Sequence, residues 1–399
     1  MEVAENGEVF GRRPKRKFLF SIISSPFRSQ TVFRKEAKTL KEAGWHVRVI
    51  AWDRKNQYPK KDTVDDIPID NISVRASYET KGIYIVFKTI GFWLIALYKL
   101  FIYRHQVDVF HCQDLNTLVP GLVASRLLNK PVVFDAKDPY PEMISIVHSA
   151  AFVKFTNFVE RFLCRHVDTI RTVNQLMRQR FEKITSKPIH IVHNYPELKD
   201  FNPEKYQGKE ADQTLVFGRI GQIREGMGIE ETVEAIKHIL KKVRVQLLFV
   251  GRIKDSYRYR FMELIDPIRN NVEYVNEVPY SNIPDYYYRM DVFMLLYNMK
   301  GIASYISPTK LFDSMAMGVP VIASDVGETR DFVEKYKCGL VIKSNEKELI
   351  LNAMETMIFN PDLRITFGQN GLRAAKTTTN WEKEKIKFVK VFNDCIRAS

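Results

Sequence analysis

The segment 308–324, which reads PTKLFDSMAMGVPVIAS, constrains the fold more than any other part of this chain. Pro308 suits the first turn of a helix, where its missing N–H costs no hydrogen bond, and the apolar residues after it have helical spacing. Gly318 predicts the end of that helix, and Pro320 prevents its continuation. Residues 321–323 then have the β-branched character of a buried strand. The segment therefore predicts a helix followed by a strand, as in a sheet covered by helices.

The start of this helix is suited to an anion. A strand is predicted to end at residues 295–297, and a helix that follows a strand directs its free N–H groups at whatever lies in front of it. Thr309, Lys310 and Leu311 form this start, and Lys310 adds a positive charge suited to a phosphate. Asp313 follows one turn later, where a carboxylate can accept two neighbouring hydroxyls, as on a ribose. An ordinary capped helix in an α/β sheet is the alternative interpretation.

Strands and helices alternate along both halves of the chain. In the first half, strand 18–23, helix 31–43 and strand 47–51 form a βαβ unit, which predicts a parallel sheet. Strands are also predicted at 107–111, 131–135, 189–194, 214–217, 245–251 and 292–296, with helices at 118–128, 229–242 and 381–396. The predicted fold class is α/β, with two doubly wound parallel-sheet domains that bind ligands where the strand carboxyl ends face a cleft.

The length of 399 residues favours two domains. The predicted organisation is an N-terminal domain at 1–194, a linker at 195–213, a second domain at 214–378 and a terminal helix at 379–399. The four cysteines lie far apart without Cys-x-x-Cys spacing, which indicates free, mostly buried thiols in a reducing cytoplasm and argues against a zinc site. The first residues lack an apolar signal core, so secretion is not expected.

Positive charge is concentrated in the first half of the chain. Residues 1–190 hold 31 Lys and Arg against 19 Asp and Glu, a net charge of +12, whereas residues 191–399 carry only +2. This asymmetry predicts an anionic partner, either a membrane surface, a lipid phosphate or a nucleic acid. Nucleic acid is disfavoured, because the sequence has no zinc finger, aromatic RNA-binding signature or recognition-helix pattern. A generally basic proteome is the alternative explanation.

Residues 83–103 form a strongly apolar stretch of nearly membrane-spanning length. Lys81, Lys88 and Lys99 argue against a span, because their intervals of 7 and 11 residues put them on one helical stripe. The stretch predicts a packed helix that contributes to a membrane-touching surface of a peripheral cytoplasmic protein. A plain buried helix and a true span are the alternatives.

Residues 308–324 resemble the nucleotide-binding signature of glycosyltransferase family 4, the retaining enzymes of the GT-B fold, in which many members read Pro-x-Lys-Leu-(Phe/Tyr)-Glu. Asp313 stands where the family usually has Glu, so the resemblance implies that Asp313 binds the ribose of a nucleotide-sugar donor. It further implies two Rossmann-like domains facing a cleft, with the acceptor side at 1–194 and the nucleotide-sugar-binding domain at 214–378, and a C-terminal helix that crosses back to the first domain.

The glycine-rich segment 218–228 is similar to the family's diphosphate loop, and two registers compete. Gly221 with Gly228 keeps the family's glycine separation, but puts Gln222 and Met227 where cations are common. The preferred register pairs Gly218–Arg219 with Gly226 and puts Arg224 near the position of the missing lysine. The resemblance therefore implies that Gly221, Arg219 and Arg224 hold the donor diphosphate.

Two further segments implied by the resemblance depart from the family pattern. Residues 134–142 resemble its Tyr-Asp-x-His segment with Lys137 in place of His, and Lys137 is predicted to stabilise charge on the leaving phosphate. Residues 109–114 resemble Val-Ile-His-x-His-Asp; here Asp114 is the predicted catalytic or sugar-binding residue, and His111 is interpreted as a core histidine. Tyr305 stands where the family often has the first Glu of its Glu pair.

The predicted function is transfer of a sugar from a nucleotide-diphosphate donor to a lipid-linked or cell-surface glycan precursor, with retention. Arg28 is the predicted acceptor-side residue, in the loop 25–30. No Asp-x-Asp dyad is placed to hold a metal, so neither a metal nor another cofactor is expected. Two alternatives remain: a catalytically impaired GT-B subunit that binds nucleotide or a partner enzyme, and a GT-B sugar-nucleotide epimerase.

Overall fold

A computed structural model describes residues 17–76, 83–145, 148–206, 214–297, 305 and 307–398. The chain divides into two compact units. Unit 1 comprises the described residues of Met1–Asp135, Phe162–Ile170 and Val389–Ser399, and unit 2 those of Ala136–Arg161 and Arg171–Phe388. Lys81 and the end of the predicted linker, 207–213, lie outside the described residues, so the predicted domain boundaries stay predictions.

The first sheet has eight strands among the described residues, in the order β3-β4-β2-β1-β5-β6-β7-β8. Its strands are β1 (Lys17–Ile23), β2 (Trp45–Trp52), β3 (Lys61–Val64), β4 (Ile67–Ile72), β5 (Val109–Cys112), β6 (Val132–Ala136), β7 (Thr169–Thr172) and β8 (Ile189–Ile191). β1 pairs in parallel with β2 and β5, which confirms the predicted parallel arrangement, but the edge strand β3 runs antiparallel to β4. The sequence analysis did not predict β3 and β4, which form a short hairpin.

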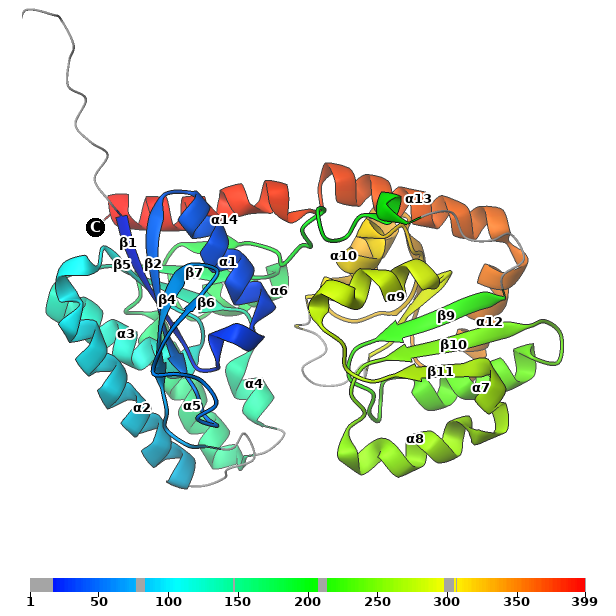
Figure 1. Ribbon diagram of the computed structural model, residues 1–399, viewed down its shortest axis with the longest axis horizontal. Helices are drawn as coiled ribbons and strands as arrows, with labels where there is room; N and C mark the ends of the chain where they lie inside the picture. Colours follow the sequence, from blue (N-terminus) through cyan, green and yellow to red (C-terminus); the bar gives the residue numbers. More distant parts are fainter. Residues whose placement is uncertain are drawn as a thin grey trace, which may run out of the picture. The chain divides into compact units, whose positions relative to one another are not determined.

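Three helices accompany these strands in unit 1: α1 (Thr31–Glu42), α2 (Ile83–Ile102) and α3 (Leu115–Leu128). α2 lies along α3 (Figure 1). It is fixed to the sheet by Phe92, whose ring stacks on that of Trp52 at a centroid distance of 4.7 Å. The terminal helix α14 (Trp381–Arg397) contributes residues from Val389 onward to unit 1. There Phe392 packs edge-on against Trp45 and His111, so the end of the chain completes the core of unit 1.

The second sheet, in unit 2, has six strands within the described ranges, in the order β11-β10-β9-β12-β13-β14. They are β9 (Leu215–Ile220), β10 (Val245–Val250), β11 (Val272–Val275), β12 (Val292–Leu295), β13 (Val321–Ser324) and β14 (Gly339–Ile342). Every neighbouring pair is parallel. The strand order reverses between β9 and β12, which makes this pair the topological switch point of the sheet.

Helices cover both faces of the second sheet (Figure 1). The helices of unit 2 are α4 (Tyr140–Ile144), α5 (Ala150–Cys164, which extends into unit 1), α6 (Gln175–Glu182), α7 (Ile229–Ile239), α8 (Arg258–Ile265), α9 (Ile283–Arg289), α10 (Thr309–Ala316), α11 (Thr329–Tyr336), α12 (Lys347–Phe359) and α13 (Pro361–Thr377). One apolar core joins α7, α8 and α12 to the sheet, and another joins α9, α10 and α13 to it. The predicted helix at 308–316 and strand at 321–323 are therefore confirmed as α10 and β13.

All four cysteines are free and buried, as the sequence predicted. Burial raises the pKa of the Cys338 thiol in unit 2 and of the Cys395 thiol in unit 1, each to about 12. Burial also raises the pKa of the Cys112 thiol, at the end of β5. These thiols stay protonated, and therefore poorly nucleophilic, at neutral pH.

Candidate nucleotide-sugar site

The loops at the switch point of the second sheet carry the residues that the sequence singled out. β9 runs into the glycine-rich loop 221–228, which leads to α7, and α10 is the next helix after β12. In open α/β sheets, ligands bind outside the carboxyl ends of the strands where the strand order reverses. The glycine-rich loop and the start of α10 make this edge the candidate site of unit 2.

Lys310 lies across the backbone of Gly221. Gly221 has φ +122°, and a Cβ atom placed on it would be 2.9 Å from Cε of Lys310. The neighbouring Gly251 permits the same closeness, because its Cβ would lie 2.2 Å from the carbonyl oxygen of Gly221. The glycines thus allow the cation of α10 to lie directly over the loop after β9.

Hydrogen bonds fix the first turn of α10. The hydroxyl of Tyr287 donates to the carbonyl oxygen of Lys310 at 3.2 Å. The N–H of Thr309 donates to the carbonyl oxygen of Ser307 at 2.8 Å, and that of Leu311 to the carbonyl oxygen of Pro308 at 2.9 Å. These two N–H groups, which the sequence analysis expected to face a phosphate, therefore donate within the turn in this structure, while the lysine side chain extends over the loop.

Asp313 follows one turn later on α10 and is buried, with 8% of its surface exposed. The charge of Asp313 acts on the phenols of Tyr280 and Tyr287. Burial raises the pKa of both phenols, and the negative charge of Asp313 raises it further, to a smaller extent. The carboxylate is therefore held on a rigid helix among apolar and phenolic groups.

Arg219 points into the protein core and away from the loop. It is buried on β9, its Nη1 donates to the carbonyl oxygen of Leu296 at 2.8 Å, and its Nε has no hydrogen-bond partner among the described residues. Burial lowers the pKa of this guanidinium to about 10. Because Arg219 lies within the strand, the structure favours the other register of the glycine loop, and the role of Arg219 toward a diphosphate stays a prediction.

The other register pairs Gly221 with Gly228, which bracket the loop in the structure. Gly221 comes directly after β9, and Gly228, with φ +66°, is the N-cap residue of α7. Gln222 and Arg224 are exposed between them. Lys310 and Arg224 therefore remain as the cations of this loop region among the residues that the sequence proposed.

At the corresponding edge of the first sheet, the polar groups form hydrogen bonds with one another. Asp114 is the N-cap residue of α3: its Oδ1 accepts the N–H of Thr117 at 3.0 Å, and its Oδ2 accepts the hydroxyl of Ser24. Burial raises the pKa of the Asp114 carboxyl, although both hydrogen bonds act to lower it. His111 is buried between Ser21 and Asp135, 3.3 Å from each, which fits its interpretation as a core histidine.

The other two residues predicted from the sequence are Lys137 and Arg28. Lys137 is half-buried directly after β6. Arg28 is exposed and makes a bidentate pair with Asp62 of β3, with both N–O distances 2.8 Å. This pairing lowers the pKa of the Asp62 carboxyl. The catalytic role of Lys137 and the acceptor role of Arg28 stay predictions.

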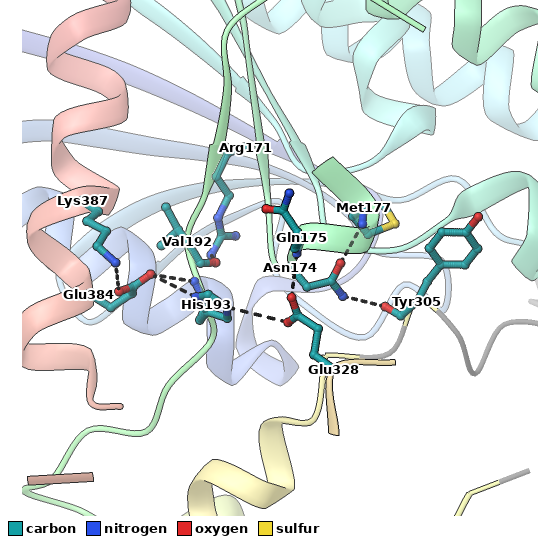
Figure 2. A network of polar contacts seen from close by, with 10 residues as sticks. All are labelled: Arg171, Asn174, Gln175, Met177, Val192, His193, Tyr305, Glu328, Glu384 and Lys387. Carbon is teal, nitrogen blue, oxygen red and sulfur yellow. Dashed lines mark hydrogen bonds and ion pairs between the residues drawn. The ribbon is translucent and has the colours of Figure 1, made fainter. Parts of the chain in front are cut away.

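A polar network around His193 was not predicted from the sequence (Figure 2). Nδ1 of His193 lies 3.5 Å from Glu384, and Nε2 lies 3.8 Å from Glu328, while the backbone N–H of His193 donates to Glu384 at 2.9 Å. Glu328 also accepts the N–H of Gln175 at 2.8 Å. No local motif indicates this network, because His193 and Glu384 are 191 residues apart in the sequence.

The rings beside His193 connect the network to α10. The imidazole stacks on Tyr195 at 5.0 Å, and Tyr195 packs edge-on against Phe312 at 4.6 Å. Phe312 immediately precedes Asp313. The network therefore supports, through Tyr195 and Phe312, the helix that carries Lys310 and Asp313.

Comparison with known proteins agrees with this arrangement. The chain is 22% identical over 359 residues to an uncharacterized glycosyltransferase of Methanocaldococcus jannaschii, covering 84% of this chain and 83% of the relative. It is 21% identical over 280 residues to the UDP-Gal:α-D-GlcNAc-diphosphoundecaprenol α-1,3-galactosyltransferase of Escherichia coli, covering 65% and 68% of the two chains. Its fold matches the sucrose-phosphate synthase of Thermosynechococcus elongatus with a TM-score of 0.76 at 19% identity, over 96% of this chain and all of that one.

Family models match nearly the whole chain. The model "Glycosyltransferase Family 4" matches residues 29–195, and the model "Glycosyl transferases group 1" matches residues 200–374. Together they cover both predicted domains, including the glycine loop and α10. This protein belongs to glycosyltransferase family 4 and is a glycosyltransferase of the GT-B fold.

Proposed function

We propose that this glycosyltransferase transfers a sugar from a nucleoside-diphosphate sugar to a lipid-linked or cell-surface glycan precursor, with retention of anomeric configuration. The observation that carries the donor half of the proposal is the position of Lys310 over Gly221 at the switch point of the second sheet. A diphosphate on this edge meets the ammonium of Lys310 and the exposed Arg224. Asp313 on the same helix supplies the acceptor for ribose hydroxyls.

Titration with UDP-, GDP- and ADP-sugars tests this donor site. The wild-type protein should bind one class of nucleotide sugar, and Lys310→Ala should weaken that binding about ten-fold or more, because a charge-assisted contact to phosphate is lost. Lys347→Ala is the matched control, since Lys347 is a half-exposed lysine of α12 that pairs with Glu348. Equal affinities of the wild type and Lys310→Ala would contradict the site.

The acceptor half of the proposal rests on charge and on a relative. The name of the Escherichia coli relative describes transfer from UDP-Gal to a diphosphoundecaprenol-linked sugar. The net charge of +12 in residues 1–190 suits an acceptor that carries lipid phosphate, and a peripheral position on the cytoplasmic face of a membrane. Incorporation of a labelled sugar into a polyprenyl-diphosphate-linked acceptor, compared with the free oligosaccharide, tests this half.

We further propose that transfer needs no metal ion. Lys310 and Arg224 would hold the leaving diphosphate in position and neutralise its charge. Lys137 would stabilise the negative charge that develops on the leaving phosphate. Turnover should therefore continue in excess EDTA at an unchanged kcat. A loss of turnover that Mg²⁺ or Mn²⁺ restores would overturn this part of the proposal.

A catalytically impaired nucleotide-binding subunit is the second candidate. It is favoured by Lys137 in the family's histidine position and by Tyr305 in its glutamate position. In the structure, Tyr305 is held through its backbone carbonyl, which accepts Nδ2 of Asn174 at 2.9 Å (Figure 2). Nucleotide affinity without release of nucleoside diphosphate across a broad panel of acceptors would favour this candidate over the enzyme. Conversion of the labelled donor in the absence of an acceptor would instead indicate an epimerase.

A further inference from the structure

α2 has one face that is fixed to unit 1. Phe92, Ala96 and Leu100 are fully buried at helical spacing, and Phe92 stacks on Trp52. Lys99 on the same side makes an ion pair with the buried Asp70 at 2.9 Å. The lysine stripe expected from the sequence is therefore not a solvent-facing stripe at this end, because Lys99 faces the protein.

The rest of the helix surface is exposed and apolar. Phe87 is 63% exposed, Leu94 64%, Tyr98 68% and Phe101 54%. At about 100° per residue, these four side chains point in nearly the same direction, opposite to the buried face. The large exposed apolar and tyrosine side chains of the helix are Tyr84, Val86, Phe87, Ile90, Leu94, Ile95, Tyr98, Phe101 and Ile102. An exposed apolar surface of this extent indicates a binding surface.

We propose that α2 docks this surface into the interfacial layer of an anionic lipid bilayer, with its axis parallel to the membrane. The inference rests on the peripheral location proposed above and identifies the element responsible for it. A helix of 20 residues is about 30 Å long, and a continuous apolar face with phenylalanine and tyrosine at its centre is suited to the boundary between headgroups and acyl chains.

The buried face distinguishes docking from spanning. By length and composition alone, Tyr84–Ile102 could cross a membrane, and among the described helices it alone meets that criterion. Crossing would require α2 to leave the Trp52–Phe92 stack and to break the Lys99–Asp70 ion pair, which would leave a buried carboxylate without that partner. Docking keeps both contacts.

The exposed arc also distinguishes a bilayer from a second protein chain. The exposed apolar side chains extend from Val86 on one side of the helix to Ile95 on the other, about 180° apart on a helical wheel. A partner helix covers a narrower seam, whereas a lipid interface can cover a whole exposed arc. The net charge of +12 in the same half of the chain complements an anionic headgroup layer.

α5 gives an independent indication of the same kind of surface. Phe155, Phe158 and Phe162 are 62%, 67% and 54% exposed, and their spacing puts them on one side of the helix. Lys154 and Arg161 are exposed immediately beside this stripe. Basic residues that flank exposed aromatic residues on one helix are typical of helices that bind anionic membrane surfaces.

Flotation of the purified full-length protein with phosphatidylcholine vesicles, with and without phosphatidylglycerol, tests the proposal. The wild type should bind the anionic vesicles more strongly, and added salt should reduce that preference. Leu94→Asp and Phe87→Asp should each lower vesicle affinity about ten-fold or more, because an inserted apolar side chain becomes charged. Ile386→Asp is the matched control on α14, where Ile386 is 68% exposed, and it should bind like the wild type.

Arg161→Glu should lower binding to the anionic vesicles only, and leave the weaker binding to phosphatidylcholine unchanged. The proposal is overturned if the wild type binds neither vesicle, if Leu94→Asp and Ile386→Asp behave alike, or if Leu94→Asp dissociates a dimer in sedimentation velocity while vesicle binding is absent. Nucleotide-sugar affinity, measured on each variant, reports folding and the donor site separately. Loss of vesicle binding with intact nucleotide affinity therefore concerns the exposed surface of the helix that carries the substitution, α2 for Leu94→Asp and Phe87→Asp and α5 for Arg161→Glu.

Discussion

The switch points of the two sheets have the same topology and opposite chemistry. In the first sheet, the chain after β5 places the carboxylate of Asp114 at the start of α3, where Thr117 and Ser24 donate to its two oxygens. In the second sheet, the chain after β12 places the ammonium of Lys310 at the start of α10, over the bare backbone of Gly221. One helix start is capped from within the protein, and the other presents a cation across a glycine loop.

This difference shows how one supersecondary unit serves two purposes. An acidic N-cap residue satisfies the N–H groups of its own helix, and thereby removes that helix start as an anion site. A helix that starts with Pro-Thr-Lys has no such side-chain cap and carries a positive charge instead. The residue at the start of the helix therefore distinguishes a structural edge of the sheet from an edge suited to a diphosphate.

The largest expected effect comes from filling the space under Lys310. Gly221→Ala should lower the free energy of unfolding by about 2 kcal/mol, because alanine is strained at positive φ, and should weaken nucleotide-sugar binding about ten-fold by displacing Lys310. Gly318→Ala is the matched control: Gly318 also has positive φ, +69°, but its Cβ would meet no atom closer than 3.7 Å. It should lose stability and keep nucleotide affinity, as measured by denaturant titration and calorimetry.

The next effect separates the two arginines of the glycine loop. Arg224→Ala should weaken nucleotide-sugar binding about five-fold, because an exposed cation next to the diphosphate is lost. Arg219→Met should leave that affinity unchanged, since the Arg219 guanidinium lies in the core and donates to Leu296. If Arg219→Met proved the more damaging variant for binding, the register Gly218–Gly226 would be restored.

The capped edge of the first sheet should respond in stability alone. Asp114→Ala should lower the free energy of unfolding by about 1 kcal/mol through loss of the cap on α3, whereas Asp114→Asn keeps a capping side chain and should cost less. Both variants should keep the wild-type affinity for nucleotide sugar. A large loss of kcat in Asp114→Asn at unchanged stability would instead support the catalytic role predicted from the sequence.

The smallest effect concerns pH and the network behind α10. Burial alone would lower the pKa of His193, but Glu328 and Glu384 reverse this and raise it above 6.5. Because the folded pKa exceeds the unfolded one, the contribution of His193 to stability is fully present below pH 6.5 and is lost as the pH rises through the raised pKa. His193→Gln should remove this pH dependence. Its Tm should be about 2 °C lower than that of the wild type below the raised pKa of His193, and the same as that of the wild type at higher pH. A wild-type protein and variant with parallel Tm profiles from pH 5 to 9 would contradict this assignment.

Both sheets were predicted only in part from the sequence, because β11 and β14 of the second sheet were missed, as were β3, β4 and β7 of the first. Residues 308–324 carry a proline start, helical apolar spacing, a glycine stop and a β-branched strand, and these local signals sufficed for α10 and β13. β3 and β4 have no comparable signal: they are short and contain Asp62, Pro68 and Asp70, which have low strand propensity. β3 and β4 pair as an antiparallel ladder, and the ion pairs of Asp70 with Arg48 and Lys99 join β4 to β2 and α2.

The residues of the candidate site also differ in whether they could be predicted from the sequence. Lys310 and Asp313 could be proposed from spacing and family resemblance, because a helix fixes their relative positions. The direction of Arg219 could not be predicted, since the alternation of a strand decides which side chains enter the core, and one residue of register reverses that choice. The His193 network could not be predicted either, because its carboxylates come from α14 and from the residue before α11, far along the chain.

The buried thiols have a practical consequence. Cys112, Cys164 and Cys395 belong to unit 1 and Cys338 to unit 2, and all are shielded in the folded protein. A thiol that reacts only when its surroundings open reports the free energy of that opening through its rate of alkylation. Mass spectrometry of the alkylated peptides therefore measures a rate of local opening in each unit. It can show whether a bound nucleotide slows the alkylation of Cys338 alone or also that of the three cysteines of unit 1.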